Sequence, residues 1–165
     1  MKHGLVALAA LAATLMASSP ASAGEAKRST FGTLPDGRAV PAVTLTNGHG
    51  VAATVIAYGA SLQSLVMPGR DGTRADVVLG YPSMADYLAK PQYFGATVGR
   101  YANRLAGGRY TVDGKGYQAP VNDGPNSLHG GTQGFDKRNW RIVSITRQGA
   151  AASVTMALVL SLIHI

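Results

Sequence analysis

Apolar positions along the chain follow a short-range alternation that turn residues interrupt at regular intervals. Residues 43–46 alternate apolar side chains with threonine, and residues 51–58 form the next largely apolar stretch. Between them, Asn47 and Gly48 tolerate the positive φ angles of a tight turn. This pattern predicts a β-hairpin with its first strand near 43–46 and its second strand over 51–58.

Three further hairpins are predicted by the same pattern. Their strand pairs are 61–67 with 75–79, 110–112 with 117–121, and 140–146 with 153–160, and their turns carry Asp71-Gly72, Asp113-Gly114 and Gln148-Gly149. Four hairpins favour an all-β sandwich or barrel over an α/β fold. Residues 24–29 are polar, and we expect them to form a loose terminus.

One short helix is predicted between Ser83 and Lys90. Ser83 can cap its first turn, Asp86 lies three residues later where a negative charge is favourable, and Pro91 ends it. Because it is so short, we expect the helix to be peripheral.

Length and composition agree with one folded, turn-rich domain or with part of a larger one. Hydrophobic residues make up 46% of the 165 residues and charged residues only 14%, with 21 glycines and 8 prolines spread along the chain. The formal net charge of +7 raises the question of a nucleic-acid partner. No basic run exceeds two residues, as at Lys27-Arg28, so we predict no nucleic-acid binding.

The N-terminal residues have the three-part layout of a secretory signal. Lys2 and His3 precede the apolar stretch 5–16, and small residues follow, ending in Ala23. We predict a signal peptide over 1–23, cleavage after Ala23, and a periplasmic or secreted location for residues 24–165, which form all or part of a domain. The apolar run is too short for a membrane helix, so no membrane partner is expected after cleavage. The chain has no cysteine, so its stability cannot depend on disulfides.

The last six residues, 160–165, differ from the rest of the chain. Their sequence Leu-Ser-Leu-Ile-His-Ile matches what a transposon-end sequencing adaptor would encode if it were read in frame. We therefore expect residues 160–165 to be artefactual.

Two polar clusters contain the candidate site residues. Residues 99–105 place Asn103 and Arg104 after an apolar stretch. The Asn103 amide offers both a donor and an acceptor, and the Arg104 guanidinium offers a planar fork of donors, which together suit sugar hydroxyls. Residues 122–131 lead to His129 and two glycines, which let the backbone approach a ligand. The alternative is that these side chains only satisfy nearby hydrogen bonds.

Other kinds of catalytic site find little support in the sequence. Outside the predicted signal and the suspect tail the only histidines are His49 and His129, and no nearby carboxylates have the spacing of a metal site. A phosphate-binding glycine loop, a Gly-x-Ser-x-Gly elbow and a cysteine nucleophile are also missing. We therefore predict no metal site.

Four motifs in order resemble the aldose 1-epimerase (galactose mutarotase) family. They are Gly-Arg-Tyr-Ala-Asn-Arg-Leu at 99–105, Tyr-Thr-Val-Asp-Gly at 110–114, Asn-Ser-Leu-His-Gly-Gly at 126–131 and Gly-Phe-Asp-Lys-Arg-Asn-Trp at 134–140. The resemblance covers 31 to about 159 and corresponds to the N-terminal portion of the family. It implies a galactose mutarotase-like supersandwich, an antiparallel β-sandwich that is incomplete at the C-terminus here. It also implies interconversion of the α and β anomers of free aldohexoses such as galactose and glucose, without a cofactor.

The resemblance also assigns roles to individual residues. Asn103 and Arg104 match the substrate-binding pair, and His129 matches the histidine that binds and polarises the sugar and so assists catalysis. The principal acid of the family is a second histidine and its base a glutamate, both further along than this sequence extends. His164 does not match that second histidine motif, so we expect this chain alone to be inactive.

Several questions stay open at this point. The alternatives are a non-catalytic carbohydrate-binding sandwich and a hexose-6-phosphate 1-epimerase. The preferred aldose, the oligomeric state and the roles of Arg100 and Asn126 are not determined by the sequence.

Overall fold

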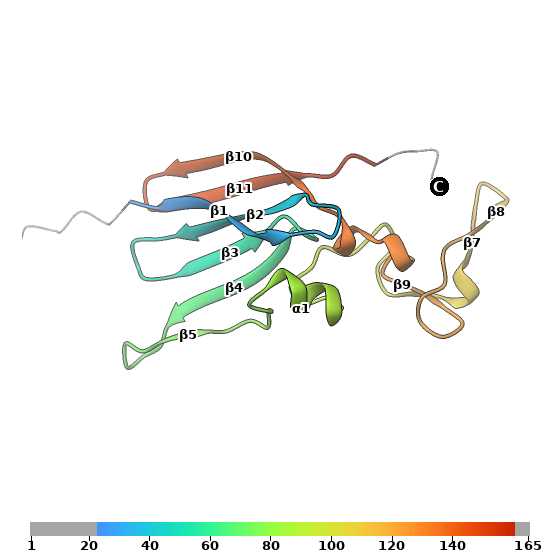
Figure 1. The fold of residues 1–165 in the computed structure, drawn as a ribbon, viewed down its shortest axis with the longest axis horizontal. Helices are drawn as coiled ribbons and strands as arrows, with labels where there is room; N and C mark the ends of the chain where they lie inside the picture. Colours follow the sequence, from blue (N-terminus) through green and yellow to red (C-terminus); the bar gives the residue numbers. More distant parts are fainter. Residues whose placement is uncertain (1–22, 161–165) are drawn as a thin grey trace, which may run out of the picture.

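The computed structural model describes residues 23–160, whose regular secondary structure is mostly antiparallel strands (Figure 1). Residues 1–22 of the predicted signal peptide and residues 161–165 of the suspected artefactual end lie outside the described residues. The largest sheet follows the order of the sequence: β1 (Glu25–Thr33), β2 (Ala39–Thr46), β3 (Ala52–Ile56), β4 (Ser61–Pro68) and β5 (Arg74–Asp76). Each of these strands pairs antiparallel with the next.

Three two-stranded ladders accompany this sheet in the described part of the chain. They are β6 (Arg104–Leu105) with β9 (Ser127–Leu128), β7 (Arg109–Val112) with β8 (Lys115–Gln118), and β10 (Arg141–Gln148) with β11 (Ala151–Ala157). Short 3-10 turns lie at Ala106–Gly108, Gly131–Gln133 and Phe135–Lys137. The β10–β11 hairpin runs along β1 and β2. The β7–β8 hairpin projects away from the five-stranded sheet, at the right of the view (Figure 1). The prediction of an all-β, antiparallel fold is confirmed.

The four predicted hairpins form, although the return strand of the third, β8, spans 115–118 and not 117–121. Local chemistry explains their turns. Between β2 and β3, the Asn47 side-chain oxygen accepts hydrogen bonds from the N–H groups of His49 and Val51, at 2.9 and 3.0 Å. Between β7 and β8, Asp113 and Gly114 both adopt positive φ, 50° and 78°, as a tight two-residue hairpin turn requires. The turn between β10 and β11 lies one residue later than predicted, at residues 149–150.

The expectation of a loose terminus over 24–29 is wrong. Those residues enter β1, which pairs with β2 from Glu25 to Thr33. Their polarity fits an edge strand, because its side chains are largely exposed while its backbone is held by the ladder to β2. Side-chain polarity alone therefore could not separate this strand from a loop.

The fifth strand of the sheet is shorter than predicted, ending at Asp76 and not at 79. One oxygen of the Asp76 carboxylate accepts the N–H groups of Leu65 and Val78, at 3.0 and 3.2 Å. The last hydrogen bond between these strands runs from the Val77 N–H to the Leu65 carbonyl oxygen, at 2.9 Å. The Asp76 side chain takes the Leu65 and Val78 N–H groups, because a short polar side chain competes with the ladder for backbone donors. Leu79, which the prediction placed in this strand, lies beyond its end and is 70% exposed.

These contacts also make the stability of the sheet dependent on pH. Hydrogen bonds from the Ser64 side chain and from the Leu65 and Val78 N–H groups lower the pKa of Asp76 below its ordinary value of 3.8. A depressed pKa in the folded state stabilises the protein above the unfolded pKa, and this contribution is lost as the pH falls through the folded pKa. We expect this contribution to the free energy of unfolding to be present at pH 5 and to decline below about pH 4.

Substituting Asp76→Asn should flatten this part of the pH profile, since the side chain no longer titrates. The measurement is the urea midpoint at pH 6 and at pH 3.5. Asp113→Asn is the matched control, because Asp113 is exposed and asparagine tolerates its positive φ. A pH profile for Asp76→Asn that runs parallel to that of the unsubstituted chain would contradict this prediction.

The predicted helix forms as α1 (Met84–Ala89) and contributes to the main core. The Ser83 hydroxyl oxygen caps it by accepting the Asp86 N–H at 3.1 Å. The helix is not peripheral, because Met84 and Tyr87 are buried against the sheet. The core cluster comprises Leu34, Val40, Ala42, Ile56, Ala57, Met84 and Tyr87.

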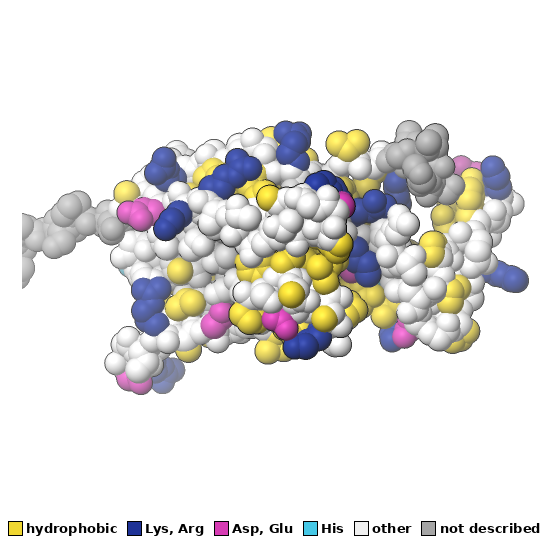
Figure 2. Space-filling model, viewed as in Figure 1, with side chains coloured by type: hydrophobic (Ala, Val, Ile, Leu, Met, Phe, Trp, Pro, Cys, Tyr) yellow, Lys and Arg dark blue, Asp and Glu magenta, His cyan; other side chains and the backbone are white. Residues whose placement is uncertain are grey.

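The face drawn in Figure 2 carries hydrophobic, basic and acidic side chains. Lysine and arginine side chains are spread over this face and do not form one continuous stripe (Figure 2). No helix among residues 23–160 has the length and apolar character needed to cross a membrane.

Candidate functional site

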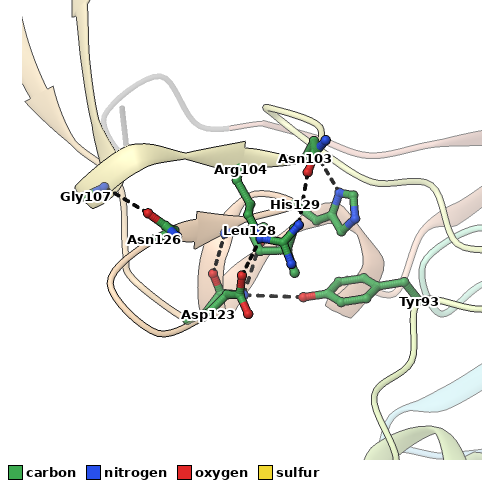
Figure 3. Close-up of polar contacts among 9 residues, drawn as sticks. Tyr93, Asn103, Arg104, Gly107, Asp123, Asn126, Leu128 and His129 are labelled. Atoms are coloured by element: carbon green, nitrogen blue, oxygen red, sulfur yellow. Dashed lines mark hydrogen bonds and ion pairs between the residues drawn. The ribbon is translucent and has the colours of Figure 1, made fainter.

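The ladder between β6 and β9 brings the two polar clusters together. In this ladder Arg104 lies opposite Leu128, so residues 99–105 and 122–131 form neighbouring strands and loops. The three residues singled out from the sequence, Asn103, Arg104 and His129, consequently lie side by side (Figure 3). Two residue pairs of the ladder, Arg104 with Leu128 and Leu105 with Ser127, bring these distant parts of the chain together.

Asn103 and His129 hold each other through reciprocal hydrogen bonds. The Asn103 N–H donates to Nδ1 of His129 at 3.0 Å, and the His129 N–H donates to the Asn103 carbonyl oxygen at 3.0 Å. Because Nδ1 accepts a hydrogen bond it carries no proton, so the neutral ring carries its proton on Nε2. Among residues 23–160, no residue forms a hydrogen bond with Nε2. The half-buried imidazole can therefore donate its Nε2–H to a ligand.

Arg104 is held by a carboxylate from the facing loop. Its Nε donates to Oδ2 of Asp123 at 2.6 Å, and one terminal nitrogen lies 3.5 Å from Oδ1 of Asn103. The side chain remains 55% exposed. A guanidinium has five N–H donors, so the remaining ones can bind hydroxyl groups on a ligand.

Asp123 was missed as a member of this site, since the sequence indicated only a turn or solvent position. The turn is present, because Asp123 and Asn126 exchange backbone hydrogen bonds. The same residue also pairs with Arg104, which is 19 residues away along the chain. A spacing of that length carries no local signal, so only the β6–β9 pairing could reveal the contact.

The two asparagines that flank this turn shape the loop. The Asn126 side-chain oxygen accepts the Gly107 N–H at 3.3 Å. Asn122 accepts the Leu128 N–H at 2.7 Å and donates to the Leu128 carbonyl oxygen at 3.1 Å. These contacts hold β9 and thereby the position of His129, the next residue.

A second group of side chains lies against the imidazole. The rings of Tyr93 and His129 meet edge to face, with centroids 4.8 Å apart and planes at 63°. The Lys137 ammonium lies 4.9 Å from the centroid of the Tyr93 ring and 2.5 Å from Oδ2 of Asp136, which is 7% exposed. The sequence motif at 134–140 contains Lys137 and Asp136, but nothing in it indicated contact with Tyr93.

The chemistry of this site suits a neutral ligand rich in hydroxyl groups. Its donors are the Arg104 fork and the Nε2–H of His129, while the carboxylate of Asp123 already has a cationic partner. Among residues 23–160 no group of three histidine, cysteine, aspartate or glutamate side chains lies close enough to hold a metal ion. One ring nitrogen of His129 thus stabilises the loop, as the hydrogen-bonding interpretation predicts, and the other is available to a ligand.

Comparison with known families decides where this chain belongs. The family model described as aldose 1-epimerase matches residues 41–162, which include all three predicted site residues. The chain belongs to the aldose 1-epimerase family. Within the family, it is 45% identical to the galactose mutarotase of Sus scrofa over 113 residues, which are 68% of this chain and 33% of that protein. It is 43% identical to the aldose 1-epimerase of Escherichia coli K12 over 110 residues, covering 67% of this chain and 32% of that protein.

Solved structures agree with the family assignment. Galactose 1-epimerase from Lactobacillus acidophilus superposes with a TM-score of 0.62 at 30% identity, over 74% of this chain and 34% of that one. An aldose epimerase homologue from C. elegans superposes with a TM-score of 0.56 at 38% identity, over 58% of this chain and 30% of that one. The chain thus spans about a third of the length of the relatives it matches.

Proposed function

We propose that this chain is the sugar-holding part of an aldose 1-epimerase that interconverts the α and β anomers of free hexoses such as galactose and glucose. The observation that carries the proposal is the Asn103–His129 pair, which leaves Nε2–H available beside the Arg104 fork. Membership of the family and the hydroxyl-binding character of the donors support a sugar as the ligand.

The reaction requires two proton transfers at one sugar. A base removes the proton of the C1 hydroxyl while an acid protonates the ring oxygen, and the C1–O5 bond breaks to give the open aldehyde. Rotation about the C1–C2 bond exposes the other face of the aldehyde, and the reverse transfers close the ring. In this proposal His129 donates a hydrogen bond from Nε2 to a sugar oxygen, and Arg104 holds neighbouring hydroxyls.

The principal acid and base belong, in this proposal, to a part of the enzyme beyond these 165 residues. The chain matches about a third of each relative, which supports the view that further residues complete the site. We therefore expect the chain by itself to bind sugar weakly and not to catalyse epimerisation.

Polarimetry of freshly dissolved α-galactose tests this proposal. A protein extended to the full length of its relatives should accelerate the approach to anomeric equilibrium, and the 165-residue chain should not. If the extended protein bound galactose without accelerating equilibration, the non-catalytic carbohydrate-binding alternative would replace the proposal. Acceleration with galactose 6-phosphate alone would favour the hexose-6-phosphate 1-epimerase alternative.

Removing the Arg104 fork should weaken sugar binding. In the extended protein, Arg104→Ala loses a charge-assisted hydrogen bond, which corresponds to about 1.5 to 3 kcal/mol and roughly a 10- to 150-fold rise in Kd for galactose. Titration calorimetry measures the change. Arg109→Ala is the control, because Arg109 is also exposed but lies on β7. Equal Kd values for the two variants would remove Arg104 from the proposed site.

We also propose that the protein is exported. The three-part N-terminal pattern supports this. Cleavage after Ala23 would make Gly24 the first residue, and the first strand, β1, begins at the next residue, Glu25. Mass spectrometry of the protein from the periplasm or medium should find Gly24 as the first residue. An intact Met1–Ala23 segment on the exported protein would contradict the proposed cleavage.

A further inference from the structure

The side chains behind His129 suggest a role for a residue outside the sugar-binding set. We propose that Tyr93 is a positioning residue, whose ring holds the imidazole of His129 with Nδ1 toward the Asn103 N–H and Nε2 toward the ligand. The consequence for catalysis rests on the proposed function, whereas the effect on the ring of His129 does not.

The need for such a residue follows from the shape of an imidazole. Rotation about the bond between Cβ and the ring is broad and roughly two-fold, so a ring can turn over at little cost unless its neighbours prevent it. A half-turn would replace Nδ1 by a carbon opposite the Asn103 N–H and would move Nε2 away from its position. The Tyr93 ring lies edge to face with the imidazole at 4.8 Å, which obstructs this rotation.

Tyr93 is itself held by two neighbours, Asn122 and Lys137. Its hydroxyl oxygen accepts the side-chain N–H of Asn122 at 3.3 Å, and the Lys137 ammonium lies 4.9 Å from the ring centroid. Lys137 is fixed in turn by Asp136, whose carboxylate is 7% exposed and lies 2.5 Å away. A cation over an aromatic face is attracted by the ring, more strongly where water is excluded. The Tyr93 ring is therefore held in place, as a positioning residue requires.

Backbone conformation supplies a second, independent observation. Tyr93, Asn103 and His129 all have positive φ, at 58°, 66° and 52°. They are three of the five non-glycine residues with positive φ among the described residues 23–160, and they contact one another in sequence-distant pairs. Such a conformation is uncommon for a bulky residue like tyrosine, and conformations of this kind concentrate at functional sites.

Nitrogen NMR of the 165-residue chain tests the positioning directly. With ¹⁵N-labelled histidine at pH 8, His129 should show an unprotonated Nδ1 and a protonated Nε2, its signals being assigned by their loss in His129→Asn. Tyr93→Leu removes the ring, so both nitrogens should shift toward the averaged values of a mixture of tautomers. Tyr93→Phe keeps the ring and should retain the unsubstituted pattern. Unchanged tautomer signals in Tyr93→Leu, or mixed tautomers in Tyr93→Phe, would overturn the proposal.

One measurement needs no substitution and stands even if Tyr93→Leu fails to fold. In the unsubstituted chain, ring protons of Tyr93 and His129 should show mutual nuclear Overhauser effects, and their absence would overturn the proposal.

Activity distinguishes this inference from the proposed function. In the extended protein, Tyr93→Leu should lower kcat at least about tenfold with a smaller change in KM, and Tyr93→Phe should restore it. If the extended protein were inactive while the tautomer pattern depended on the Tyr93 ring, the proposed function would fail and the positioning role would stand. Full kcat in a folded Tyr93→Leu variant would overturn the catalytic consequence.

Discussion

Replacing Gly130 with alanine is expected to lower the free energy of unfolding by about 2 to 5 kcal/mol. Gly130 has φ of 92°, and a Cβ atom there would overlap the Gly99 carbonyl oxygen and lie 2.6 Å from the Gly99 carbonyl carbon. These are backbone atoms that cannot swing aside. The Gly99 carbonyl oxygen also accepts the Phe135 N–H at 3.1 Å, so relief of the clash would break that contact.

Gly124→Ala separates the steric clash from the backbone effect. Gly124 also has positive φ, 54°, but no atom lies within 4 Å of a Cβ placed there. Its substitution should therefore cost only about 1 kcal/mol, from the strained φ alone. Urea unfolding followed by the fluorescence of Trp140, the single tryptophan, measures both variants. Equal losses of stability would show that close packing against residue 99 is unimportant.

Replacing His129 with asparagine is expected to lower kcat/KM of the extended protein by about 10²- to 10³-fold while leaving the fold intact. The asparagine side-chain oxygen can take the place of Nδ1 and accept the Asn103 N–H, and asparagine tolerates the positive φ of 52°. What the variant lacks is a donor at the position of Nε2. The expected loss therefore reports the interaction with the sugar and not the support of the loop.

His129→Leu provides the comparison, because it removes both interactions. The Asn103 N–H loses its partner, and leucine, unlike asparagine, is strained at a φ of 52°, so the free energy of unfolding should fall by about 1 to 3 kcal/mol. Steady-state polarimetry and urea unfolding are measured on both variants. If His129→Asn retained activity, or if activity fell only in proportion to stability, the imidazole would have a structural role alone.

The sequence predicted much of this fold because the signals are local. Alternation with a period of two identifies strands, and pairs such as Asn47-Gly48 and Asp113-Gly114 identify turns, within a few neighbouring residues. The short helix was equally visible through Ser83 and Pro91. The failure at β1 has the opposite cause, since an exposed edge strand shows no apolar face and is defined by its partner.

For the candidate site, the sequence by itself determined the donor and acceptor chemistry of Asn103, Arg104 and His129, from which sugar binding is predicted. Only the tertiary structure decided how they are used. The β6–β9 ladder sets Asp123 against Arg104 and the Asn103 N–H against Nδ1 of His129, which leaves Nε2–H for a ligand. The physical reason is that hydrogen-bond donors and acceptors are properties of a residue type, whereas their partners depend on distances set by packing between remote segments.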